Sequence, residues 1–188
     1  MPGQKFWCPR IDDIDPKMCM GYANAVLLCG INDVKQSDVQ CESDVVNIYN
    51  KLKRKVKDIQ KLSPKTFIYI CRLLPTKNTE LNMKVDTFNR LIHFDMLQTC
   101  KGVQCVDGFH KFADHNGHLA CELSKSFDRQ GRLDMLHLNR SGVSVLAYLI
   151  KQSIFLRLHG GVDKRRHTSR LDGRLYSNVA RGPPAPRR

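Results

Sequence analysis

Two short motifs combine residue types that act together in ester hydrolysis. In the first, Asp134 precedes His137 by three residues, in a turn that leads into an apolar, helix-like run. An Asp at this spacing can hold the imidazole in one tautomer and stabilise its protonated form, as an acid does for a general base. In the second, Asn32 follows Gly30 at the end of an apolar run, where its amide can point at a developing oxyanion. The motifs together indicate a base, its orienting acid and an oxyanion donor.

Each motif also has an ordinary structural interpretation. An isolated Asp-x-x-His can be a turn that starts a helix, with a capping carboxylate and a solvated imidazole. The pair Asn32-Asp33 can form an Asx turn. Moreover, the sequence contains no Gly-Asp-Ser block and no Gly-x-Ser-x-Gly elbow that would present a nucleophilic serine. We therefore identify no nucleophile and expect ester chemistry to be impaired.

The elements that must position these motifs alternate between two hydrophobic periods. Short apolar runs predict strands buried on both faces over residues 25–29, 66–71 and 102–106. Three- and four-residue spacings predict helices over residues 43–62, around 85–96, and from an N-cap at Ser141 to about 157. Residues 109–133 are polar and irregular. The apolar faces expected to form the core are Val45, Tyr49, Leu52, Val56 and Ile59, then Val85, Phe88, Ile92 and Met96, then Val143, Leu146, Ile150 and Ile154.

This order of strands and helices predicts an α/β fold, a three-layer αβα sandwich with a parallel sheet of the flavodoxin-like kind. In such sheets, reactive residues gather in loops beyond the carboxyl ends of the strands. Gly30 to Asp33 follow one of these ends, and the turn from Asp134 to His137 can reach the same edge. We therefore expect His137 and Asn32 to face one pocket.

Charge divides the chain of 188 residues into a domain, residues 1–157, and a basic tail, residues 158–188. Nine Arg and Lys face two Asp between Arg157 and Arg188, so this part carries more than half of the formal net charge of +13. Its Gly, Pro and Arg content and few large apolar residues predict disorder. Such a tail can attract nucleic-acid phosphates weakly and without specificity. A solubilising tail is the simpler interpretation.

Two further features bound the location of the chain and its cofactors. No apolar run is long enough to span a bilayer, and the first residues lack a signal-peptide core, so we expect an intracellular, cytoplasmic protein that is not secreted. Six His and Cys lie close together, but their spacings match no compact zinc site and no Cys-x-x-Cys pair is present, so we expect no metal, and we expect no cofactor. The six are Cys100, Cys105, His110, His115, His118 and Cys121.

The motifs resemble conserved blocks of a known family. Gly30-x-Asn32-Asp33 and Asp134-x-x-His137-Leu138-Asn139 resemble the third and fifth blocks of the SGNH, or GDSL-like, hydrolases. Between them, residues 70–75 resemble the strand that ends in a Leu-Pro pair, and residues 82–89 resemble the helix that follows. This form of the family is similar to the esterase domains carried by LINE-type retrotransposon proteins. The resemblance covers about residues 5–157.

The resemblance implies a five-stranded parallel sheet and hydrolysis of acyl esters, of small molecules or lipids, without a cofactor. It makes His137 the general base and Asp134 its orienting acid. Asn32 donates to the oxyanion, and Gly30 keeps the strand end free of a side chain.

The chain departs from the family at its beginning. The family places its serine in a Gly-Asp-Ser block at the end of the first strand, and this chain resembles the domain without that strand and the helix after it. Residues 5–11 resemble the second strand and its loop, with Arg10 at or near the position of an oxyanion-hole glycine. Loss of the first strand, which lies between the second and third, should expose sheet edges and lower stability. We expect an N-terminally truncated, impaired esterase domain or, alternatively, a non-catalytic module associated with nucleic acid through its tail. The oligomeric state stays open.

Overall fold

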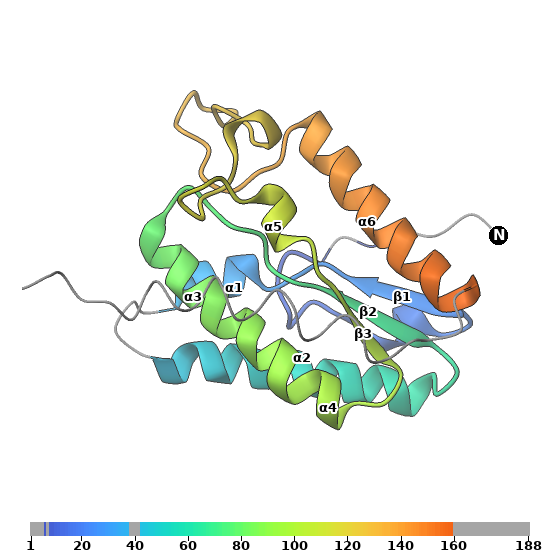
Figure 1. Ribbon diagram of the computed structural model, residues 1–188. Helices are drawn as coiled ribbons and strands as arrows, with labels where there is room; N and C mark the ends of the chain where they lie inside the picture. The colour runs from blue at the N-terminus through green and yellow to red at the C-terminus, as the bar shows by residue number, and fades with distance from the viewer. Residues whose placement is uncertain (1–5, 7, 38–41, 160–188) are drawn as a thin grey trace, which may run out of the picture. The chain divides into compact units, whose positions relative to one another are not determined.

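A three-stranded parallel sheet lies at the centre of the fold (Figure 1). The computed structural model describes residue 6, residues 8–37 and residues 42–159. The strands β1 (Asn24–Leu27), β2 (Phe67–Cys71) and β3 (Val103–Val106) follow one another across the sheet in sequence order. Leu27 stands opposite Ile70, which stands opposite Cys105. The predicted α/β class with parallel strands is therefore confirmed.

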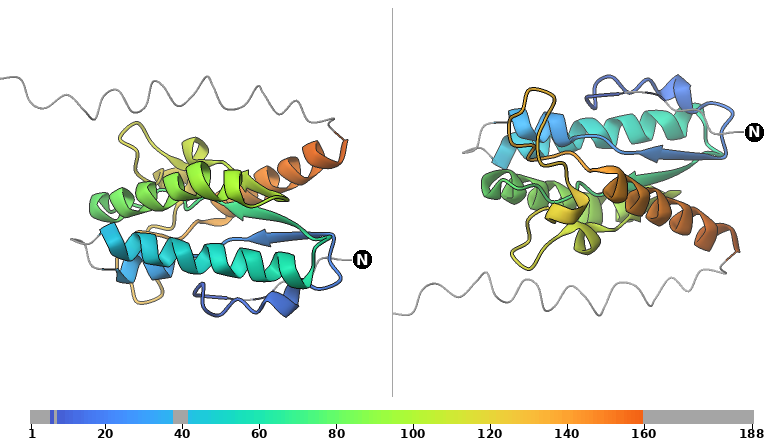
Figure 2. Two further views of the ribbon diagram at one scale, coloured as in Figure 1. Left: turned by 90° about the horizontal axis from the view of Figure 1, so that it is seen from below. Right: turned by 90° about the horizontal axis from the view of Figure 1, so that it is seen from above.

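Helices cover both faces of this sheet. On one face lie α1 (Ile31–Gln36), α2 (Glu42–Leu62), α3 (Thr79–Leu91) and α4 (Leu97–Thr99), and on the other lie α5 (Phe109–Phe112) and the first part of α6 (Arg140–His159), as Figures 1 and 2 show. Three short helical segments complete the chain: η1 (Pro16–Cys19), η2 (Ile92–Met96) and η3 (Cys121–Leu123). The chain divides into two units, residues 1–151 and 152–188, and the description below concerns the first.

The main core lies between the sheet and the helix pair α2 and α3. Every residue predicted for the apolar face of residues 43–62, namely Val45, Tyr49, Leu52, Val56 and Ile59, is at most 3% exposed. Val85, Phe88, Ile92 and Met96 are fully buried. Burial of each such side chain contributes about 1.5–3 kcal/mol to the free energy of unfolding. The packing of the apolar faces of α2 and α3 against the sheet is therefore the main source of stability.

The second predicted helix is not continuous. Its last turns, residues 92–96, form the π-helical segment η2 before α4 resumes the α-helix. The wider turn brings Asp95 to α2, where its Oδ2 accepts hydrogen bonds from the Tyr49 hydroxyl at 2.6 Å and the Lys53 Nζ at 2.7 Å. A π-turn inserts one residue into the helix, which hydrophobic spacing alone does not reveal.

β1 differs from its prediction because only one of its faces is buried. Leu27 is 9% exposed and packs into the main core, whereas Val26 and Leu28 on the other face are 38% and 53% exposed. β1 is an edge strand, so neither a neighbouring strand nor a helix of the described residues shields these two side chains. In contrast, β2 lies in the middle of the sheet and is buried on both faces, as predicted.

The resemblance implied five strands, and the described residues form three. Residues 5 and 7 lie outside the described part of the chain, and residues 8–11 form a bend rather than a strand. β1 therefore borders the sheet on one side.

The start of α6 and the exposure of Val143 differ from prediction, whereas Leu146 and Ile150 of the predicted face do pack inward. The helix begins at Arg140, and the Asn139 side chain caps it by accepting a hydrogen bond from the Gly142 N–H at 2.9 Å, so Asn139 rather than Ser141 is the N-cap. The helix thus starts two residues earlier than predicted, and Val143, in its first turn, is 55% exposed. Leu146 packs with Phe112 and Leu119 in a second, smaller core on this face of the sheet.

Other expectations concern the ends of the chain and the membrane. From residue 160 onward, the predicted basic tail lies outside the described residues. Among the helices described, none is long and apolar enough to cross a bilayer. Residues 109–133, which were predicted to be irregular, contain two short helical elements, α5 with four residues and η3 with three.

Candidate active site

Asp134 and His137 form a hydrogen-bonded pair in the turn before α6. The His137 Nδ1 lies 3.0 Å from both carboxylate oxygens of Asp134. The Asp134 side chain is 3% exposed and the imidazole is 70% exposed, so the acid is buried behind a base that reaches solvent. The pair therefore has the arrangement of an orienting carboxylate and a general base.

Backbone hydrogen bonds hold this turn in place on both sides. The Asp134 N–H donates to the Ser126 carbonyl at 3.0 Å, and the Lys125 N–H donates to the His137 carbonyl at 2.9 Å. From the loop after β2, the Lys77 N–H donates to the Met135 carbonyl at 3.0 Å. The polar segment before the turn thus serves as its support, which its sequence did not suggest.

The Asp134 carboxylate is kept ionised by local donors. Burial alone would raise its pKa, but its Oδ1 accepts hydrogen bonds from the backbone N–H groups of His137 at 2.9 Å and Leu136 at 3.0 Å. Together with the His137 imidazole, these donors lower the pKa of Asp134 below its usual value. An ionised Asp134 selects the neutral imidazole tautomer with its proton on Nδ1, which leaves the lone pair on Nε2.

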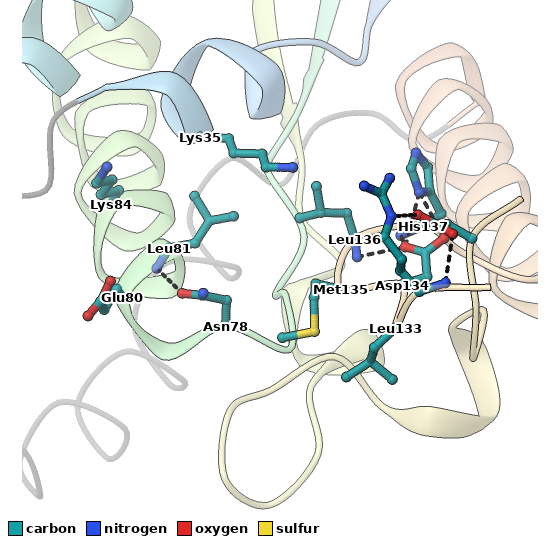
Figure 3. Close-up of a pocket in the computed structure, with 12 residues that line it drawn as sticks. Lys35, Asn78, Glu80, Leu81, Lys84, Leu133, Asp134, Met135, Leu136 and His137 are labelled. Carbon is teal, nitrogen blue, oxygen red and sulfur yellow. Dashed lines mark hydrogen bonds and ion pairs between the residues drawn. The ribbon is translucent and has the colours of Figure 1, made fainter. Parts of the chain in front are cut away.

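A cavity of about 580 Å³ adjoins the pair (Figure 3). Its wall combines three cations, three acids and four apolar side chains with Asn78 and His137. The set comprises Lys35, Lys84, Arg132, Glu80, Asp128, Asp134, Leu81, Leu133, Met135, Leu136, Asn78 and His137. None of these twelve described residues carries a hydroxyl or a thiol. The wall therefore offers a base and charged groups but no side-chain nucleophile.

Sequence reasoning missed the cations of this cavity. Arg132 pairs with Asp128 at 2.9 Å, and the Lys84 Nζ, largely buried, donates to the Ser37 carbonyl. Lys35, on α1, extends toward the turn of residues 134–137 in Figure 3. These residues come from α1, α3 and the irregular segment, and no short motif links them. One indication of these cations was present in the sequence: Lys35 lies two residues after the motif from Gly30 to Asp33.

Asn32 and Asp33 hold the N-terminal segment against α1. The Asn32 Nδ2 donates to the Pro9 carbonyl at 2.9 Å, and the Asp33 Oδ2 accepts from the Ile11 N–H at 3.1 Å. Lys35 of α1 lines the cavity beside His137, but Asn32 is not among the lining residues, and its amide donates to Pro9 instead. The cavity therefore does not bring the amide of Asn32 and the imidazole of His137 together, contrary to the prediction from sequence.

Gly30 is required where β1 turns into α1. Its φ of 107° lies in the region that side chains rarely adopt, and it is the N-cap residue of α1. An added Cβ would lie 3.2 Å from the Phe88 ring, so the position is also crowded. The expected role, a strand end free of a side chain, matches this geometry.

Two arginines, Arg10 and Arg72, have defined surroundings. Arg10 is exposed, and its backbone N–H donates to the Asp13 carboxylate at 2.9 Å. Arg72, at the end of β2, pairs its Nη1 with the Asp107 carboxylate at 2.7 Å and is 13% exposed. Arg72 thus joins the ends of β2 and β3.

Cysteines near the strand ends are poor substitutes for the missing serine. Burial raises the pKa of the Cys29, Cys71 and Cys105 thiols to about 12, so almost no thiolate is present at neutral pH. Within the described residues, no group of three or more His, Cys, Asp or Glu side chains is placed to hold a metal ion.

Comparison with solved structures shows that several proteins, a carbohydrate esterase among them, share this fold. A protein described as a platelet activating factor from Streptococcus pneumonia superposes with a TM-score of 0.57 and 22% identity, over 70% of this chain and 59% of its own. A carbohydrate esterase family 3 protein from Talaromyces cellulolyticus gives a TM-score of 0.50 and 14% identity, over 74% and 60%. The OSK domain of Drosophila Oskar gives 0.54 and 16%, over 70% and 61%.

These likenesses establish the fold. The chain spans about three fifths of the length of the structures that it resembles. No protein-family model and no curated protein matches the sequence.

Proposed function

We propose that this chain is an acyl-ester hydrolase domain of the SGNH type, related to the esterase domains of LINE-type retrotransposon proteins, with impaired activity. His137 is the general base, Asp134 its orienting acid and Asn32 the oxyanion donor. The observation that carries this proposal is the buried Asp134 carboxylate on the His137 Nδ1, beside a cavity. The esterase folds among the solved structures are consistent with it.

The chemistry of the site explains why turnover should be low. The Nε2 lone pair of His137 can take a proton from an alcohol or from water. Because the described wall supplies no hydroxyl or thiol, water is the nucleophile left to this base. Without the covalent route, only binding and oxyanion groups remain to accelerate hydrolysis.

The impairment is tested with p-nitrophenyl acetate and the full chain. We expect hydrolysis at the buffer rate, unchanged in His137→Ala. Clear turnover that disappears in His137→Ala would show that the chain is an active esterase.

The site itself is tested by restoring a nucleophile. A Gly-Asp-Ser strand and helix fused upstream should produce esterase activity that Asp134→Asn lowers on the order of 10³–10⁴-fold, because the wrong tautomer is then favoured. In the unfused chain, nitrogen NMR of the imidazole should find the proton on Nδ1. A proton on Nε2, with no rescue by the fusion, would remove the basis for a hydrolase site.

A non-catalytic interaction module is the second candidate. The absence of hydroxyl and thiol groups from the described cavity wall favours it. It predicts that the fused serine strand restores no hydrolysis although the protein folds. The two candidates therefore give opposite results in the same experiment.

A further inference from the structure

The outer face of α2 carries a line of cations away from the cavity. Between Lys51 and Leu62, six Lys or Arg face a single acid, Asp58. Arg54, Lys57 and Lys61 recur at three- and four-residue steps, which places them on one face of the helix, opposite the buried stripe. We call these three residues, with Lys65 in the following turn, the α2 cationic stripe.

The other cations of α2 have partners, which separates them from the stripe. Lys51 pairs with Asp12 at 2.8 Å, and Lys53 pairs with Asp95 at 2.7 Å. The Lys55 Nζ donates to the carbonyls of Asp12 and Ile14 at 3.0 and 2.8 Å. These three cations attach α2 to its neighbours, and their charge is partly compensated there.

The charged groups of the α2 cationic stripe face solvent. All four are exposed, and within the described part of the chain their side chains form no ion pair or hydrogen bond, although Arg54 lies near enough to Asp12 to help lower its pKa. Asp58 flanks the stripe four residues after Arg54 and neutralises part of one charge. The stripe therefore presents a surplus of about three positive charges.

The stripe extends in both directions along the helix. Toward the N-terminus, the exposed Asn47 and Asn50 continue the same face, so that the polar line from Asn47 to Lys61 is about 21 Å long. At the other end, the Gln60 side chain donates to the Lys101 carbonyl, which brings a further exposed cation beside the helix end. Figure 2 shows α2 on the outside of the sheet.

We propose that the α2 cationic stripe binds the phosphate backbone of a single-stranded nucleic acid. Cations on one helix face lie about 5–6 Å apart, a spacing that lets successive side chains reach neighbouring phosphates. Asn side chains commonly bind phosphate and sugar oxygens next to such cations. A membrane-binding helix would place a row of large apolar residues along its cations, whereas this face continues with Asn47 and Asn50, and the exposed apolar residues of α2 are Val46 and Leu62. The inference does not depend on the hydrolase proposal.

Counterion release gives the size of the effect. Four cations that each neutralise one phosphate contribute about −2.8 to the slope of log K against log salt for a single strand. Between 50 and 200 mM salt, this slope corresponds to about a 50-fold loss of affinity.

The experiment measures binding of the full chain to a fluorescein-labelled oligo(U) RNA by anisotropy, across that salt range. The stripe variant changes Arg54, Lys57, Lys61 and Lys65 to Gln. A matched control removes the same charge from four exposed lysines scattered over the fold, namely Lys17, Lys111, Lys125 and Lys151. The basic tail is present in all three proteins, so its contribution cancels. Phosphatidylserine vesicles form a second arm.

In the stripe variant, the slope of log K against log salt should become shallower by about 2 to 3. In the control variant, it should change clearly less. Equal losses in the two variants would mean that net charge alone drives binding, and the proposal would be wrong. It would also be wrong if wild type does not bind RNA at 50 mM salt, or if the stripe changes affect only vesicle binding. Unfolding midpoints should stay close to wild type, since the four side chains have no partners to lose.

Discussion

Replacing Gly30 by Ala should destabilise the fold by about 2–4 kcal/mol, from two separate causes. The backbone at Gly30 has a φ of 107°, and a left-handed backbone costs a side chain about 1–2 kcal/mol. The new Cβ would also lie 3.2 Å from the Phe88 ring. That ring is fully buried and packs edge-on against Tyr49, with 6.4 Å between ring centroids, so it has little room to move. Crowding of this kind adds about 1 kcal/mol or more.

Gly21→Ala provides the matched control. Gly21 also has a positive φ, of 80°, but a Cβ there would meet no atom within 4 Å. It should therefore show the backbone cost alone, and the difference between the two variants in urea unfolding, followed by circular dichroism, isolates the crowding. At constant m-value, each kcal/mol should also lower the Tm by roughly 2–4 °C.

A third variant checks the assigned cause. In a Phe88→Leu background, which removes the crowding ring, Gly30→Ala should cost about as much as Gly21→Ala does in wild type. If Gly30→Ala and Gly21→Ala are equally destabilising in wild type, Phe88 does not constrain this turn, and the close fit between the core and the start of α1 is refuted.

Other expected outcomes concern the support of the site. Asn89→Ala removes the bonds to the Leu73 N–H and carbonyl, 2.8 and 2.9 Å long, and should cost about 2–4 kcal/mol in urea unfolding because both groups stay buried; a neutral result would contradict this. Burial opposes ionisation of Asp134, but its donors prevail and lower its pKa, so its stabilisation is present above about pH 4 and disappears as the pH falls through the folded-state value. Between pH 5 and 2, wild type should lose more stability than Asp134→Asn, and parallel curves would argue against the hydrogen-bonded carboxylate. Gly142→Ala would press a Cβ against the Leu123 carbonyl and should shift the NMR signals of the adjoining turn, while unchanged spectra would exclude this close packing.

Helix periodicity predicted the main core because α2 and α3 each bury one continuous stripe. Val56 and Phe88 are fully buried, as their spacing requires. The prediction that β1 is buried on both faces was wrong at Val26. An apolar run indicates that a strand prefers burial, but it does not indicate whether another element packs against each face. Val143 also differs from prediction: it lies in the first turn of α6, where it is exposed, while Leu146 and Ile150 on the same predicted face pack inward.

At the candidate site, sequence could predict local contacts better than distant ones. The three-residue spacing of Asp134 and His137 is enough to bring a carboxylate to an imidazole in one turn. The partner of Asn32 could not be read in this way, because Pro9 reaches it only through the bend of the N-terminal segment. The cavity cation Lys35 was missed for the same reason.

The exposed border of β1 has a consequence for handling the protein. Val26 and Leu28 stand at the rim of the sheet, and the run from Ala23 to Gly30 contains no charge and no proline to discourage an added strand. Two molecules that meet along this rim can continue one another's hydrogen-bond ladder, so solubility should fall with concentration faster than the high net charge suggests. A lysine in place of Val26 would put a charge on this edge strand and disfavour pairing with a second molecule.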